Sequence, residues 1–141
     1  AVMIGRGAHG SPWIFRDVNS FLATGKNSAP LLRTEIRDII LEHITALYAF
    51  HGEAAGARIA RKHLGWYCQQ HTDTQGFRPH LMAAESSSVQ FATAAACFGQ
   101  WADEWTDKEN KIPGQERANA GNESEERQVA GSAQTSHHRH A

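Results

Sequence analysis

The chain begins with AVMIGRGAHGSPWIF, and this segment restricts the fold more than any other part of the sequence. A short apolar run, Ala1–Ile4, ends at a glycine, which is typical of a strand buried on both faces of a parallel sheet. The loop Gly5–Gly10 spells G-x-G-x-x-G, and Ser11 and Pro12 then stand in the order expected of a helix N-cap and first helical residue. The segment therefore predicts one strand, one glycine-rich loop and one helix that ends near Gly25.

The glycine-rich loop has to be interpreted through its surroundings, because G-x-G-x-x-G alone is weak evidence for a binding site. A dinucleotide-binding fold needs a second parallel strand after the helix, ending in an acidic residue that holds the ribose. Here the linker TGKNSAPLL leads into more helix, and Glu35, at a suitable distance, falls within that helix. Two interpretations remain: the loop and Arg6 hold one phosphate, as in many TIM barrels, or the loop is a turn that binds nothing.

Helical segments dominate the sequence after the linker. Apolar residues recur at helical spacing over residues 34–51, and Gly52 is expected to end that helix. A second helix is predicted over residues 53–71, and a third helical region starts near Pro79 and is expected to break at the serines 86–88. Short connections between helices favour a small antiparallel bundle.

The second predicted helix has one cationic face. On a helical wheel Arg58, Arg61 and Lys62 fall within one arc, which Gly65 and Gln69 share and no acidic residue interrupts. The opposite side carries small and apolar residues suited to packing, namely Gly56, Ala60, Leu64 and Tyr67. The phosphates of an RNA would suit the cationic face, and an ordinary solvated helix surface is the alternative.

The remaining residues with chemical potential favour structural roles. His63 lies at the edge of the packed side, where we expect a hydrogen-bonded boundary histidine rather than a metal ligand or a catalytic base. Trp66 suits a core or interface position. Two cysteines, Cys68 and Cys97, do not make a disulfide framework, so we expect a reduced cytoplasmic setting and no metal site.

Composition divides the chain near residue 102. Residues 1–102 carry nine Lys and Arg against seven Asp and Glu, whereas residues 103–141 carry five against eight and few large apolar side chains. The second part is predicted to be a disordered tail, and its histidine-rich end is interpreted as a solvated terminus rather than a metal site. No apolar run is long enough to cross a membrane, and no secretory signal is recognised.

Three pieces of the sequence together resemble a known family. In order and spacing, VMIGRGAHGSPWIF, GARIARKHLGWY and GFRPHLMAAES are similar to the C-terminal part of bacterial tRNA-dihydrouridine synthases, most of all the B type, over roughly residues 1–101. Members of that family have an FMN-binding TIM barrel followed by a helical tRNA-binding domain. They reduce particular uridines in tRNA to dihydrouridine and use NADPH to reduce the flavin.

The resemblance implies a fold and a set of sites. Residues 1–29 would be the last βα unit of the barrel and a linker, residues 30–102 the helical tRNA-binding domain, and residues 103–141 the disordered tail. The chain would thus be mostly α, a small bundle preceded by one piece of a barrel. Gly5 and Arg6 would contact the FMN phosphate, and the side chains facing tRNA would be Arg58, Arg61, Lys62, His63 and Tyr67.

The chain also departs from the family pattern. The family's catalytic cysteine stands in an asparagine–glycine–cysteine–proline context, which neither Cys68 in WYCQQ nor Cys97 in AACFG has. We therefore expect no catalytic residue here and no activity from this chain alone. Two alternatives stay open: an RNA-binding helical module without flavin, and a structural domain whose basic face pairs with an acidic protein. No stable protein partner is otherwise expected.

Overall fold

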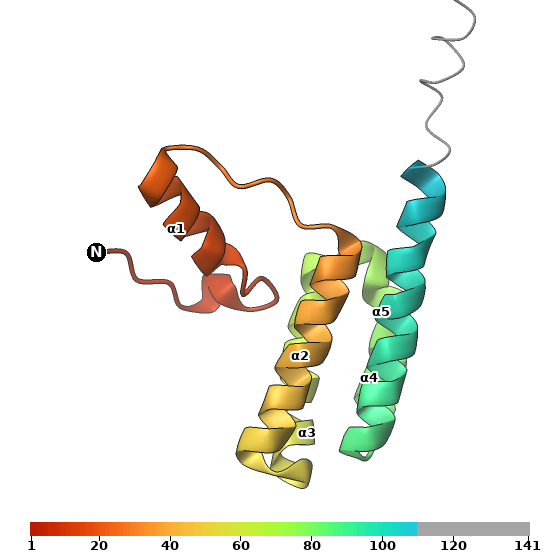
Figure 1. Ribbon diagram of the computed structural model, residues 1–141. Helices are drawn as coiled ribbons and strands as arrows, with labels where there is room; N and C mark the ends of the chain where they lie inside the picture. Colours follow the sequence, from red (N-terminus) through yellow and green to blue (C-terminus); the bar gives the residue numbers. More distant parts are fainter. Residues whose placement is uncertain (110–141) are drawn as a thin grey trace, which may run out of the picture. The chain divides into compact units, whose positions relative to one another are not determined.

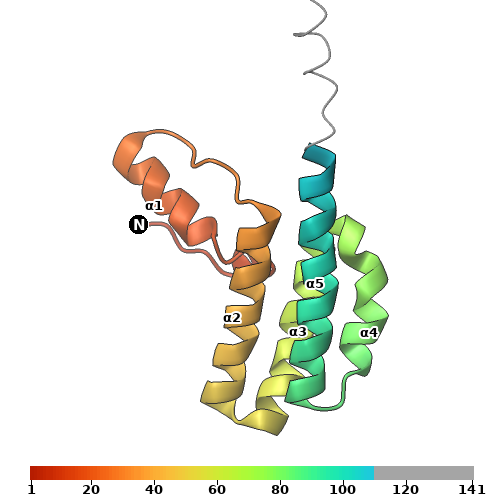
Figure 2. The same cartoon turned by 45° about the vertical axis from the view of Figure 1, so that its right-hand side comes forward.

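The protein is described by a computed structural model that covers residues 1–109. Residues 1–105 belong to one compact unit. Figures 1 and 2 show α2, α3, α4 and α5 gathered side by side, with α1 joined to them through an extended linker. The elements in chain order are the 3-10 helix η1 (Arg6–Ala8), α1 (Ile14–Thr24), α2 (Arg33–His51), α3 (Glu53–Gln70), the 3-10 helix η2 (Thr72–Phe77), α4 (Arg78–Ala83) and α5 (Ser87–Glu109).

The mostly helical fold is confirmed, but the strand predicted at Ala1–Ile4 is not present. These residues have no regular structure, and Val2 and Met3 are 70% and 97% exposed. A strand forms only where its backbone N–H and C=O groups pair with a neighbouring strand, and none of residues 1–109 forms one. The predicted barrel unit is therefore absent from the part of the chain that the structure covers.

The first helix begins later than its sequence signals suggest and ends where they place it. Ser11 does not cap the helix; α1 starts at Ile14, after a turn in which the Ile14 N–H donates to the Ser11 carbonyl at 3.1 Å. At the other end Gly25 adopts φ 70°, and its N–H donates to the Phe21 carbonyl at 2.7 Å. Glycine suits this left-handed position because it has no Cβ.

The bundle helices lie close to their predicted bounds. The helix α2 starts one residue before the predicted segment, and α3 ends one residue before its own. A break does separate α4 from α5, but it covers residues 84–86, because α5 already begins at Ser87. Glu35, considered above as a ribose ligand, instead accepts a hydrogen bond from the Leu32 N–H at 2.8 Å and so caps the start of α2.

The helix α5 continues past Asp103, where the tail was expected to begin. Its extension is explained by contacts with the start of α2 and with η2. The Arg33 guanidinium carbon lies 4.6 Å from the Trp101 ring and 4.7 Å from the Trp105 ring, a cation–π arrangement on both. The Trp101 indole N–H also donates to Asp73 Oδ2 at 2.9 Å. The rest of the predicted tail, from residue 110, lies outside the described residues.

The core lies where α2, α3 and α5 meet. Gln90 of α5 is fully buried and joins all three helices: its amide donates to the Ala57 carbonyl at 3.1 Å, and Tyr48 donates to its amide oxygen at 2.6 Å. Each polar atom in this link thus has a partner, which burial requires. The fully buried apolar side chains of the core include Ile40, Ile44, Leu64, Leu81 and Phe98.

Two glycines in the bundle helices provide a matched test of packing. A Cβ on Gly56 would lie 2.7 Å from both the Leu47 carbonyl oxygen and the Tyr48 Cα, whereas a Cβ on Gly99 would meet nothing within 4 Å. Alanine favours a helix over glycine by about 1 kcal/mol, so Gly99→Ala should stabilise the protein by up to that amount. Gly56→Ala should instead destabilise it by about 2 kcal/mol, because α2 and α3 must separate. Urea unfolding measures both, and equal shifts would contradict the close α2–α3 contact.

Candidate nucleic-acid interface

A cationic hollow of about 280 Å³ lies between α3 and α4. Arg61 and Lys62 come from α3, and Arg78 comes from the start of α4. No Asp or Glu is among the described residues that line it. The full lining is Arg61, Lys62, Gly65, Trp66, Gln69, Arg78 and Met82. The hollow thus gathers three positive charges from two helices around one opening.

The arginine of α3 is held in place inside this cationic hollow. Arg61 Nη2 donates to the Ala84 carbonyl at 2.7 Å, which ties α3 to the end of α4. Its Nε is buried and has no partner among residues 1–109. A buried donor without a partner is costly, so this part of the Arg61 side chain is under strain in the bundle.

Gly65 keeps the floor of the cationic hollow open. A Cβ at this position would lie 3.9 Å from Arg78 Nε, an ordinary van der Waals separation. A Cβ at this position would therefore lie beside the guanidinium of Arg78. The glycine lets a large partner approach the cations closely.

An indole forms one wall of the hollow. Trp66 stacks on His9, with ring centroids 3.7 Å apart and planes within 3° of parallel, and meets His63 edge-on at 5.0 Å. Both histidines restrict its movement. A fixed aromatic wall beside cations suits a nucleic acid, because bases stack on aromatic rings while phosphates pair with Arg and Lys.

His63 and Tyr67 face away from the cationic hollow into a partly buried cluster. His63 lies 4.5 Å from the His43 ring, and His43 Nδ1 shares a 2.9 Å hydrogen bond with the Tyr67 hydroxyl. Burial, aided by His43 and His9, lowers the pKa of His63 to about 4, so this imidazole is neutral at pH 7. Burial also raises the pKa of the Tyr67 hydroxyl.

The predicted RNA-facing residues therefore differ in their exposure and in whether they line the cationic hollow. Arg61 and Lys62 line the cationic hollow, and Arg58 is exposed on the same helix but outside that lining. His63 is half-buried. Tyr67 is only 1% exposed, so in this structure it offers no surface to an RNA. Its position on the packed side of α3 explains this, and its hydroxyl supports His43 instead.

Sequence reasoning missed Arg78, Met82 and the role of Trp66. The first two lie on α4, and their place depends on how η2 returns α4 against α3, which no local pattern encodes. One signal was present: Arg78 is the only Lys or Arg between Lys62 and Lys108. An isolated cation in a long stretch without other Lys or Arg was a reason to ask what it faces.

The loop Gly5–Gly10 has an exposed part and a buried part. Gly5 and Arg6 are exposed, and Arg6 makes no side-chain hydrogen bond or ion pair with any of residues 1–109. A Cβ on Gly5 would meet nothing within 4 Å. Open backbone beside an unpaired guanidinium fits a phosphate group. Gly10, in contrast, is buried against α3.

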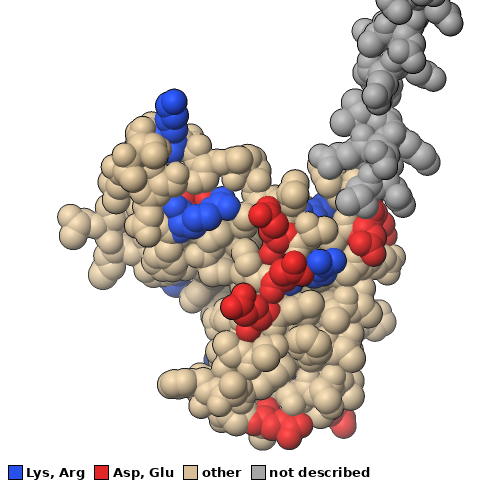
Figure 3. Space-filling model, in the orientation of Figure 1, with Lys and Arg blue, Asp and Glu red and all other residues tan. Residues whose placement is uncertain are grey.

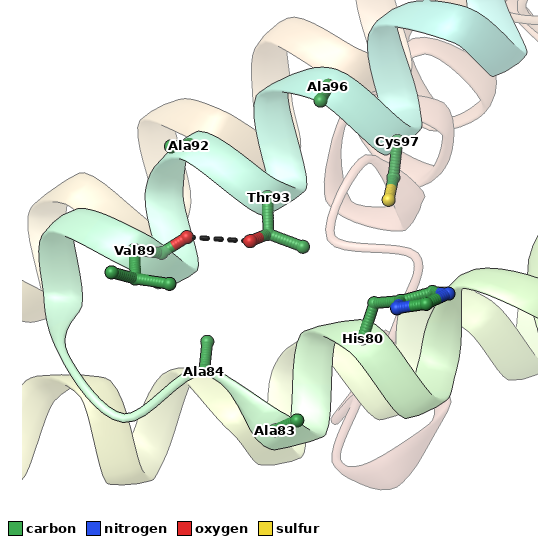
Figure 4. Close-up of a pocket in the computed structure, with 8 residues that line it drawn as sticks. All are labelled: His80, Ala83, Ala84, Val89, Ala92, Thr93, Ala96 and Cys97. Atoms are coloured by element: carbon green, nitrogen blue, oxygen red, sulfur yellow. Dashed lines mark hydrogen bonds between the residues drawn. The ribbon is translucent and has the colours of Figure 1, made fainter.

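Another pocket, of about 540 Å³, lies between α4 and α5 and differs in chemistry. Figure 4 shows that its walls are mostly small side chains, with Cys97 on α5 and His80 on α4 among them. The Thr93 hydroxyl donates to the Val89 carbonyl at 2.8 Å, so it is already paired. None of the described residues lining this pocket is Lys or Arg, which makes it poorly suited to phosphate.

Acidic side chains mark a different face of the molecule. On the face shown in Figure 3 they gather over α2, where Lys and Arg are few. Glu35, Asp38 and Glu42 of α2 are all exposed. A polyanion would be repelled there, which leaves the α3–α4 side as the better surface for one.

A helical domain with a cationic, indole-walled hollow and a separate phosphate-compatible loop has the features of a nucleic-acid-binding protein. The chain belongs to the dihydrouridine synthase family, whose model, described as "Dihydrouridine synthase (Dus)", matches residues 1–102. Among residues 1–109, no helix is long and apolar enough to cross a membrane, and no cluster of three or more His, Cys, Asp or Glu could hold a metal ion.

Curated relatives resemble the chain over the same region. It is 50% identical over 98 residues to tRNA-dihydrouridine synthase B of Xanthomonas axonopodis pv. citri, covering 70% of this chain and 30% of that protein. The proteins of the same name from Vibrio cholerae and Pectobacterium carotovorum are 47% and 45% identical over 98 residues, with the same coverage. The chain thus spans about 30% of the length of these relatives.

Proposed function

We propose that this chain is part of a flavin-dependent tRNA-dihydrouridine synthase that reduces uridine to 5,6-dihydrouridine in tRNA. The observation that carries the proposal is the cationic hollow between α3 and α4, in a chain whose relatives are named for acting on tRNA. In this proposal the chain supplies RNA contacts and part of a flavin phosphate site.

The RNA contacts come from both helices of the hollow. Arg61, Lys62 and Arg78 hold backbone phosphates, and Trp66 offers a ring face or edge to a base or ribose. Arg58 adds long-range attraction from the exposed side of α3. These contacts orient the tRNA without reading its sequence, because they reach the phosphate backbone and a ring surface common to all bases.

The flavin contact comes from the exposed half of the glycine-rich loop. Gly5 and Arg6 hold the phosphate of FMN, which when bound supplies the hydride for uridine reduction and is itself reduced by NADPH. In this proposal the chain's own cysteines do not provide the accompanying proton, because neither stands in the family's asparagine–glycine–cysteine–proline context. Cys68 is also fully buried, away from any substrate.

A second candidate is an RNA-binding helical module without catalysis. This candidate is favoured because α3 and α4 supply all of the residues that line the cationic hollow. The proposed flavin site, in contrast, consists here of only two exposed residues, Gly5 and Arg6. The two candidates differ in whether the loop Gly5–Gly10 contributes to flavin binding. A flavin titration therefore separates them.

Arg6→Ala, in a full-length synthase carrying this segment, should weaken FMN binding by about 1.5–3 kcal/mol, the contribution of one charge-assisted hydrogen bond. That is roughly a 10- to 150-fold rise in Kd. Arg16→Ala is the matched control, because Arg16 is also exposed and pairs with Asp17 at 2.7 Å. Fluorescence titration of FMN measures both variants, and dihydrouridine in bound tRNA is measured by mass spectrometry. Equal FMN affinity in the two variants would favour the RNA-binding module.

A further inference from the structure

The loop Gly5–Gly10 is attached to α3 at its buried end. Gly10 has φ 74°, and a Cβ there would lie 2.5 Å from the Trp66 carbonyl oxygen and 2.7 Å from Gln70 Cγ. His9, one residue earlier, stacks its ring on the Trp66 indole at 3.7 Å. Backbone contact and ring stacking thus meet at the same turn of α3.

Among residues 1–109, the exposed end of the loop has no comparable attachment. Its hydrogen bonds are internal: the Ala8 N–H donates to the Gly5 carbonyl at 3.0 Å, and the His9 N–H to the Arg6 carbonyl at 3.1 Å. A Cβ on Gly7 would touch only the Ile4 side chain, at 4.0 Å. The position of Gly5 and Arg6 relative to the bundle is therefore set by what holds residues 9 and 10.

Trp66 belongs both to this attachment and to the cationic hollow. One face of its ring carries His9, and the residue also lines the hollow beside Arg61 and Lys62. Downstream of the loop, Trp13 packs against the core and lies 6.4 Å from the Tyr67 ring. One helix, α3, therefore holds both the glycine-rich loop and the cations.

We propose that His9 and Trp66 are positioning residues that fix the flavin-phosphate loop at a set distance from the RNA-binding hollow. Neither is a catalytic residue. The stack fixes the position of Gly5 and Arg6 relative to α3. The flavin phosphate and the tRNA backbone are thereby held at a constant separation. The link to flavin and tRNA rests on the proposed function, whereas the attachment of the loop does not.

The attachment is tested in the chain itself by amide hydrogen exchange. His9→Ala removes the stack, and Gly10→Ala forces the loop away from the Trp66 carbonyl without removing a ring. Both should speed exchange at the amides of residues 8–11 about tenfold and leave the amides of α2 and α3 unchanged. His9→Phe should restore protection, because a phenyl ring can stack on the indole. His51→Ala, a histidine exposed at the end of α2, is the control and should change nothing in the loop.

The functional consequence is tested in a full-length synthase carrying this segment. His9→Ala should raise the Kd for FMN about three- to tenfold and change the Kd for tRNA by less than about twofold, because Arg61, Lys62 and Arg78 stay in the hollow. His9→Phe should return FMN affinity to within about twofold. A purely structural role would change thermal stability instead of separating the two affinities. Unchanged loop exchange in both His9→Ala and Gly10→Ala overturns the attachment. Faster exchange with unchanged FMN affinity overturns the positioning role, while a missing effect of Arg6→Ala overturns the flavin assignment itself.

Discussion

Gly65→Glu is expected to reduce tRNA binding by this chain about 100-fold at low salt while the bundle stays folded. A Cβ at this position meets Arg78 Nε at 3.9 Å, so the new side chain enters the cationic hollow without displacing a backbone. Its carboxylate would then lie among Arg61, Lys62 and Arg78. A carboxylate in that place pairs with cations that would otherwise hold phosphates, and it repels the RNA backbone.

The salt dependence should change together with the affinity. Each phosphate neutralised by a cation contributes about 0.7–0.9 to the slope of log K against log salt, so losing three contacts makes the slope shallower by about two to three units. The substitution should not unfold α3, because glutamate forms helices better than glycine does. Fluorescence anisotropy of labelled tRNA across a salt series measures affinity and slope, and circular dichroism reports helix content.

Gly99→Glu is the matched control, since it makes the same charge change in a helix at a glycine that faces open space. It should lower tRNA affinity only slightly, through net charge. Removing Arg58, Arg61 and Lys62 together with Arg78 by alanine substitution should reproduce the loss seen in Gly65→Glu. If Gly65→Glu binds tRNA as tightly as Gly99→Glu, the α3–α4 hollow is not the RNA surface.

Phe98→Ala should lower the free energy of unfolding by about 3–5 kcal/mol. Phe98 is fully buried in α5, with its ring 6.2 Å from both the Phe77 and the Trp101 rings in edge-on contacts. Truncation removes the buried ring and leaves a cavity between α5 and η2 that the neighbouring helices cannot fill. The same substitution also removes two aromatic pairs.

Phe91→Ala makes the identical chemical change on the exposed side of the same helix, where Phe91 is 37% exposed. Its cost should stay below about 1 kcal/mol, because most surface substitutions change stability little. Urea unfolding followed by circular dichroism measures both variants. Similar losses at the two positions would mean that α5 does not pack as described.

Local patterns determined the helices of the bundle. Helical spacing predicted an apolar stripe on α2 made of Ile36, Ile39, Ile40, Ile44 and Leu47. Ile36, Ile40 and Ile44 are buried, whereas Ile39 and Leu47 are half-buried. Gly25 and Gly52 both adopt positive φ at the ends of helices, as their positions in the sequence predicted. These features depend on residues a few positions apart, so they can be predicted from the sequence without the tertiary structure.

The wheel argument also found part of the candidate site. It grouped Arg61 and Lys62 with Gly65 on one face of α3, and the structure brings all three to one hollow. Their contact with tRNA stays a prediction. The same wheel put Tyr67 on the packed side, and the residue is 1% exposed in this structure. The RNA contact that the family resemblance implied for Tyr67 stays a prediction.

What the sequence by itself determined were the helices, their ends and the cationic face of α3, because each follows from residues within one or two helical turns. Only the tertiary structure decided that Arg78 completes the cationic hollow and that Gly10 must be glycine against the Trp66 carbonyl. Both depend on contacts between segments that are distant in the chain. The strand predicted at Ala1–Ile4 does not form, because it too depends on segments distant in the chain. Its backbone groups need partners from other strands, and an apolar run cannot supply them alone.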